Sequence, residues 1–142
     1  MTADDVEEVA GKGLFDSTLD LTDAISRQDA PGALKVLRGL FASSVPRYAD
    51  IVGLLSWHLR TLLKGRILWE GGRGEFVTVS ALKVPKRLRH SFLAQVKRMS
   101  AGALSSKLDT LLDADLDSKT GRMDPKVALE AVVVKLCLGE RG

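Results

Sequence analysis

The sequence has 142 residues and a net charge of +3, and 45% of it is hydrophobic, which is enough for a sizeable core. This length fits one domain, and the single cysteine, Cys137, excludes an internal disulfide. The apolar residues are mostly Leu, Val, Ile and Ala without alternating β-branched runs, so we predict an all-α, single compact domain of about six to eight helices. The N-terminus lacks the order of a secretory signal, so we expect a cytoplasmic protein.

Three helices are predicted before residue 46. Residues 2–10 form a short helix capped by Thr2, and residues 15–28 form a second. Asp29 caps a third helix, which has Pro31 in its first turn. The predicted inward residues of the second and third helices are Phe15, Leu19, Thr22, Ile25, Ala33, Leu34, Leu37, Leu40 and Phe41. Those predicted to face solvent on the second helix are Asp16, Asp20, Asp23 and Arg27.

Residues 46–70 are predicted to form the long helix around which the others pack. Pro46 suits its first turn, and Gly71 and Gly72 end it. Twenty-five residues give a helix about 37 Å long, the diameter of a small domain. Its charged residues exclude a membrane span. The predicted inward face consists of Ile51, Leu54, Leu55, Leu59, Leu62 and Leu63.

The second half begins with an ambiguous segment at residues 76–82, either a short helix or a turn. An isolated strand is also open there, because Val77 and Val79 alternate with polar residues. Residues 86–99 are predicted to form a basic helix. Ser100 caps the next helix, which runs to about Leu116. The inward residues of these two helices are predicted to be Leu88, Phe92, Val96, Met99, Leu104, Leu108, Leu111 and Leu112.

The last helix is predicted to begin after the cap Asp124, with Pro125 opening it. Its apolar residues lie on more than one side, so it needs burial on several sides. Two readings stay open: the helix is central within the domain, or it lies in a subunit interface. The candidate interface residues are Val127, Val132, Val133, Leu136 and Leu138.

Positive charge is concentrated in residues 76–108. This stretch contains seven Lys or Arg and no acid, whereas the other residues carry 14 basic and 18 acidic side chains, a balance of −4. A basic segment on an otherwise acidic chain indicates an anionic partner, such as nucleic acid or an acidic protein surface. The alternative is an ordinary solvated helix face.

No catalytic site is predicted. Neither His58 nor His90 has a carboxylate or cysteine at the spacing of a catalytic triad or a zinc site, and we interpret His58 as a packed helix residue. The glycine-rich run at residues 71–74 lacks the spacing of a phosphate-binding loop. We therefore expect neither an enzyme nor a cofactor.

The acidic run at residues 113–124 partly matches a calcium-binding loop, with Asp at template positions 1, 3, 5 and 12. Ser118 replaces the glycine at position 6, and Asp124 replaces the usual glutamate at position 12. Asp124 also serves as a helix cap. We therefore interpret the run as a polar loop between helices and predict no metal.

Several runs together resemble the delta subunit of the bacterial DNA polymerase III clamp loader. The first is Phe15-Asp16 followed by LTDAI at residues 21–25. The second is the pattern LLxxxLRxLLK at residues 54–64, with a proline ahead of it at Pro46. The third is LxxKTG at residues 116–121, followed by ALE at 128–130 and a closing apolar helix. The resemblance extends over about residues 6–138.

The resemblance implies that this is the C-terminal, collar-like helical bundle of a longer subunit. Residues 1–13 look like the linker or short helix that follows an absent N-terminal ATPase-like module, and residues 14–142 look like the collar domain. The implied function is non-catalytic: assembling the complex that loads the sliding clamp on primed DNA in replication. The sliding clamp itself is not expected to bind this part.

The implied partners are the gamma/tau and delta-prime subunits, with primed DNA possible within the complex and no membrane. Because a loader surrounds DNA, the basic residues become candidate nucleic-acid contacts. These are Lys83, Lys86, Arg87, Arg89, Lys97, Arg98, Lys119 and Arg122. The alternative from another class is a free-standing basic helical module that binds nucleic acid by itself.

Overall fold

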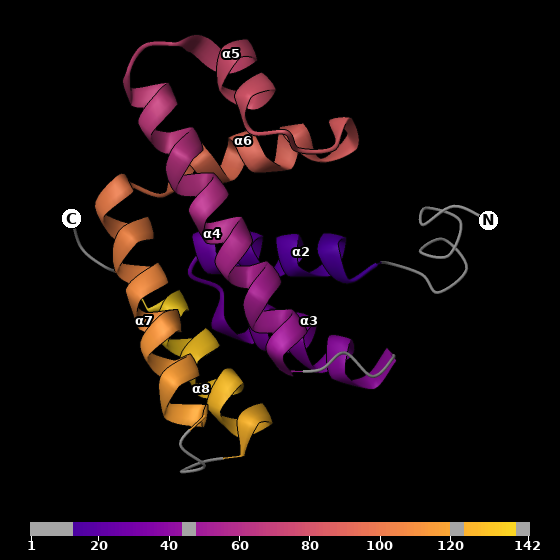
Figure 1. Cartoon of the computed structure of the whole chain (residues 1–142). Coiled ribbons are helices and arrows are strands. Elements are labelled where there is room, and N and C mark those ends of the chain that lie inside the picture. The colour runs from indigo at the N-terminus through magenta and orange to yellow at the C-terminus, as the bar shows by residue number, and fades with distance from the viewer. Residues whose placement is uncertain (1–12, 44–47, 120–123, 139–142) are drawn as a thin grey trace.

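A computed structural model describes residues 13–43, 48–119 and 124–138, and within them it contains seven α-helices and no strand. The prediction of an all-α domain is confirmed (Figure 1). The helices are α2 (Leu14–Ser26), α3 (Ala30–Ser43), α4 (Tyr48–Glu70), α5 (Gly74–Ala81), α6 (Arg89–Arg98), α7 (Ala101–Lys119) and α8 (Pro125–Cys137), with a 3₁₀ turn, η1, at Lys86–Leu88. The predicted helix at residues 2–10 and its cap Thr2 lie outside the described residues, as does Pro46. None of the described helices is long and apolar enough to cross a membrane.

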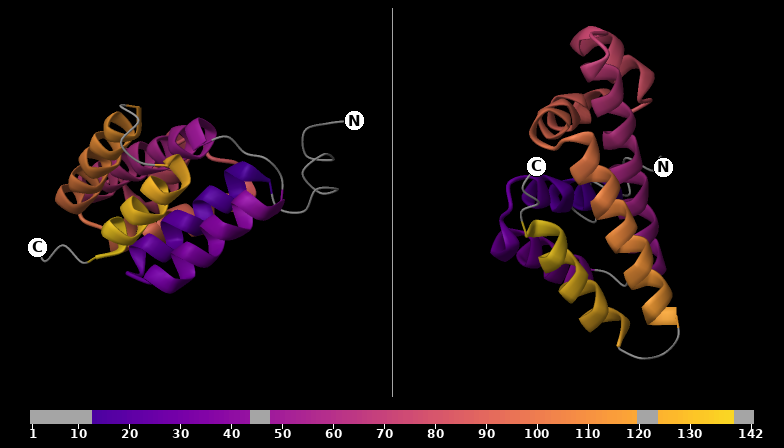
Figure 2. Two further views of the ribbon diagram at one scale, coloured as in Figure 1. Left: turned by 90° about the horizontal axis from the view of Figure 1, so that it is seen from below. Right: turned by 90° about the vertical axis from the view of Figure 1, so that its left-hand side faces the viewer.

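Helix α4 is the centre of the domain, as predicted. It packs against α2, α5, α6, α7 and α8, whereas α3 reaches the rest of the fold through α2 and α8 (Figures 1 and 2). The α5–α6 pair covers the C-terminal part of α4, and α2, α7 and α8 lie beside the rest of it. Helix α5 is therefore held by α4 and α6, whereas α6 packs against both α4 and α2.

Three of the predicted helix caps form. Asp29 Oδ1 accepts a hydrogen bond from the Gly32 N–H at 3.0 Å, at the start of α3. Ser100 Oγ accepts from the Ala103 N–H at 3.1 Å, and Asp124 Oδ1 accepts from the Lys126 N–H at 2.8 Å. Each side chain satisfies a backbone donor that the first turn leaves free. The caps therefore fix where α3, α7 and α8 begin.

The predicted inward faces are correct with one exception. Every residue predicted to face inward is buried or half-buried except Leu112, which is 44% exposed. The core stripe of α7 runs through Leu104, Leu108 and Leu111, and Leu112 lies one residue, or about 100°, beyond its edge. The strand considered for residues 76–82 is also wrong, because Gly74–Ala81 is helical.

Arg66 of α4 holds the C-terminal end of α6. One amino group of its guanidinium donates to the carbonyls of Val96 and Lys97, each at 3.2 Å, and its Nε donates to Glu70 at 2.8 Å. The same guanidinium stacks over Trp69, 5.0 Å from the ring centre. Because the last carbonyls of a helix have no partner within it, a cation there stabilises the helix end.

Candidate nucleic-acid and subunit surfaces

Three of the predicted nucleic-acid contacts are paired with acids from other helices. The pairs are Arg87–Asp16 at 2.9 Å, Arg98–Asp23 at 2.7 Å and Lys97–Glu75. Two of these acids come from α2 and the third from α5. The stretch that contains no acid in sequence is therefore partly neutralised in space by acids from α2 and α5.

The other predicted contacts differ in exposure. Lys83 and Lys86 are exposed and have no acidic partner among the described residues. Arg89 is half-buried, and its Nε donates to the Val84 carbonyl at 3.3 Å. The side chains of Lys119 and Arg122 lie outside the described residues. Of the predicted contacts, Lys83, which precedes η1, and Lys86, its first residue, are therefore the exposed cations that remain available.

Three of the five candidate interface residues are part of the domain's own core. Val132, Val133 and Leu136 of α8 are 4%, 0% and 2% exposed. They cannot meet a partner, because α8 packs between α3 and α7 and also contacts α2 and α4. Helix α8 therefore packs one side within the domain, and the reading of a subunit interface remains only for its exposed side. Only Val127 and Leu138 remain exposed.

His58 is fully buried where α2, α4 and α6 meet. The rings of Phe15, Trp57 and Phe92 surround it, with centroids 4.6, 5.4 and 5.5 Å from the imidazole. Its Nε2 lies 3.1 Å from the Phe15 carbonyl and 2.8 Å from Thr18 Oγ1. A carbonyl oxygen only accepts, so Nε2 carries the proton and Nδ1 does not. Nδ1 is buried and has no hydrogen-bond partner among the described residues.

This environment favours the neutral imidazole. Burial lowers the pKa of His58 from 6.5 to about 4, against smaller opposing effects of the Phe15 carbonyl and the Asp16 carboxylate. A proton added at Nδ1 would place an unpaired donor and a charge among aromatic rings. His58 thus acts as a neutral link between α4 and α2, which agrees with its interpretation as a packed residue.

The acidic run does not form the polar loop that its composition predicted. Helix α7 continues to Lys119, so residues 113–119 are helical. Carboxylates two residues apart point to different sides of a helix and cannot converge on one ion. Residues 120–123 lie outside the described residues. Among the described side chains, no group of three or more metal-ligating residues is close enough to hold an ion.

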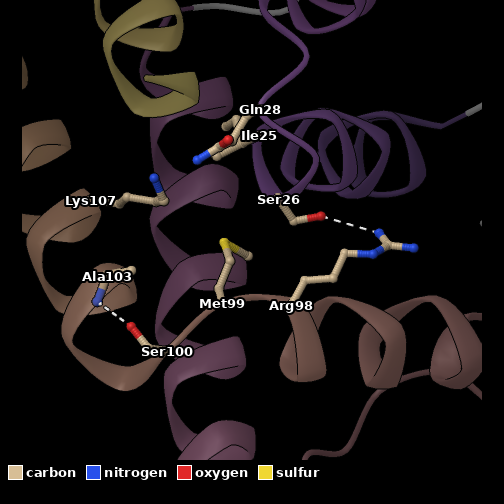
Figure 3. Close-up of a pocket in the computed structure, with 8 residues that line it drawn as sticks. All are labelled: Ile25, Ser26, Gln28, Arg98, Met99, Ser100, Ala103 and Lys107. Atoms are coloured by element: carbon tan, nitrogen blue, oxygen red, sulfur yellow. Dashed lines mark hydrogen bonds between the residues drawn. The ribbon is translucent and has the colours of Figure 1, made fainter. Parts of the chain in front are cut away.

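A cavity of about 190 Å³ lies between the end of α2 and the α6–α7 junction (Figure 3). The two positively charged side chains that line it, Arg98 and Lys107, already donate hydrogen bonds to other groups of the protein. Arg98 bonds Ser26 at 3.2 Å as well as Asp23, and the buried Lys107 donates to the Leu136 carbonyl at 2.7 Å. Lys107 thereby holds the C-terminal end of α8, a function that nothing in its sequence context indicated.

The described part of the chain is thus a helical bundle in which three of the predicted basic contacts are paired with acids of α2 and α5. The family described as "DNA polymerase III delta subunit, C-terminal domain" matches residues 16–136. The chain belongs to this family, and the resemblance seen in its sequence is confirmed.

A solved structure supports the same fold. The Bacillus subtilis DNA clamp loader delta protein (YqeN) superposes with a TM-score of 0.77 at 24% sequence identity. The match covers 96% of this chain and 40% of that protein, so the chain spans less than half of its relative's length. No match was found among curated proteins.

Proposed function

We propose that this chain is the non-catalytic collar domain of a clamp-loader delta subunit and joins that subunit to its gamma/tau and delta-prime neighbours. The observation that carries the proposal is the family match, which runs from α2 to α8. The match begins at residue 16 and α2 begins at Leu14, which supports residues 14–142 as the domain and residues 1–13 as the linker before it.

The free-standing nucleic-acid-binding alternative is less well supported. Arg87, Lys97 and Arg98 each lie against a carboxylate, and a paired cation attracts phosphate less than a free one. We therefore expect the domain to bind other protein subunits rather than to bind nucleic acid by itself. Contact with primed DNA belongs to the assembled complex, and the sliding clamp is not expected to bind this domain.

Co-purification with the other clamp-loader subunits of the same organism tests the proposal. The salt concentration is set high enough to screen exposed charges, so that nonspecific association is removed. We expect a stoichiometric complex that persists through size-exclusion chromatography. Absence of a complex, together with salt-sensitive DNA binding by the domain alone, would replace the collar by the nucleic-acid module.

Charge reversal at Lys83 and Lys86 tests the DNA contact. In the assembled loader, the double variant Lys83→Glu/Lys86→Glu is expected to weaken binding to primed DNA and to reduce the slope of log K against log salt by about 1 for each lysine that touches phosphate. The matched control is Arg60→Glu/Lys64→Glu on the exposed side of α4. If both double variants weaken DNA binding equally, the effect comes from long-range charge alone. If Lys83→Glu/Lys86→Glu leaves DNA binding unchanged, the contact is excluded.

A further inference from the structure

The outer side of α7 carries two exposed leucines on one face. Leu112 is 44% and Leu116 is 63% exposed, and a spacing of four residues makes them neighbours on the helix surface. The inner side of α7 already packs through Leu104, Lys107 and Leu111. The two leucines therefore contribute little to the domain's own core, and together they form an apolar strip in contact with solvent.

Two carboxylates border this strip. Asp109 and Asp113 are exposed, and they also lie four residues apart on the same side of α7. Like charges at this spacing repel each other and destabilise a helix. Neither has an ion-pair or hydrogen-bond partner within the described part of the chain.

The other described acids are used within the domain. Asp16, Asp23, Glu70, Glu75 and Glu130 form ion pairs. Asp29 and Asp124 cap helices, and Asp20, Asp50 and Asp115 have interactions of their own. Among the acidic side chains that the structure describes, the two without a partner in the domain are thus Asp109 and Asp113, at the border of the apolar strip.

We propose that the outer face of α7, formed by Asp109, Leu112, Asp113 and Leu116, binds a helix of a neighbouring clamp-loader subunit that presents apolar side chains flanked by Lys or Arg. Burial of the leucines would supply affinity, and cations opposite the two aspartates would supply orientation and association rate. The inference rests on the proposed function and assigns the contact to α7, in place of the buried side of α8.

The test compares surface variants in binding to the purified neighbouring subunits. Leu112→Ser/Leu116→Ser is expected to raise Kd by about tenfold or more, as loss of a central apolar contact does. Asp109→Lys/Asp113→Lys is expected to slow association at low salt, with an effect that shrinks as salt rises. The matched control is Ile67→Ser/Val77→Ser, which changes residues that are 58% and 45% exposed elsewhere. Circular dichroism verifies that each variant is folded.

The outcomes separate the two proposals. If the wild-type chain forms the complex and Leu112→Ser/Leu116→Ser binds as tightly as the control, the α7 contact is wrong while the collar function stands. If the wild-type chain forms no complex, both proposals fail. Sedimentation of the chain alone gives the remaining outcome: self-association that the leucine variant abolishes would identify a second copy as the occupant and overturn the proposed partner.

Discussion

Acidification from pH 6.5 to about pH 4 is expected to lower the free energy of unfolding by about 3 kcal/mol through His58 alone. In this range the imidazole is protonated in the unfolded chain but neutral in the folded one, because burial lowers its pKa. The unfolded state then binds more protons, so falling pH favours unfolding. Above pH 6.5 the contribution of His58 is constant, and below about pH 4 no more stability is lost.

Two measurements check this prediction. Urea unfolding at steps of pH gives the free-energy curve, and the NMR shifts of the imidazole follow the proton on His58 itself. The variant His58→Gln keeps every carboxylate, so the difference between its curve and that of the wild type isolates the histidine. Titration of His58 close to pH 6.5, with parallel curves for the two proteins, would contradict the burial argument.

The position of His58 also illustrates what the sequence could predict. Apolar spacing identified α4 and its inward face, and the caps Asp29, Ser100 and Asp124 were recognisable because a cap needs only a local pattern. The local pattern also led to the interpretation of His58 as a packed helix residue, which its burial confirms. It could not show that the Phe15 carbonyl, 43 residues away, would accept a hydrogen bond from its Nε2–H.

The candidate surfaces were predicted less well for the same reason. Arg87 and Asp16 are 71 residues apart, and Arg98 and Asp23 are 75 apart, so no window along the chain could reveal their pairing. The apolar character of α8 was recognised correctly. Hydropathy does not distinguish a helix packed against its own domain from one that awaits a partner, because leucine and valine serve both. Only the burial of its side chains in the fold showed that α8 packs against its own domain.

The second large effect is expected at Gly65 of α4, which packs against Val96 of α6 and against Leu82, the residue that follows α5. A Cβ at this position would lie 2.9 Å from Val96 Cγ2 and 3.1 Å from Leu82 Cδ1. Both neighbours are buried, so neither can move without displacing others. Gly65→Ala is therefore expected to destabilise the domain by about 1–3 kcal/mol through overpacking, although alanine is the better helix former.

Gly53 provides a matched control on the same helix. Nothing lies within 4 Å of a Cβ placed there, so Gly53→Ala is expected to stabilise the domain by about 1 kcal/mol through helix propensity. Urea unfolding of the two variants should therefore give shifts of opposite sign. Adding Val96→Ala to Gly65→Ala removes the closest methyl and should recover part of the loss, a coupling that a double-mutant cycle measures. If Gly65→Ala stabilised the chain as much as Gly53→Ala, α6 would have to move freely over α4, and close contact would not hold the short helices in place.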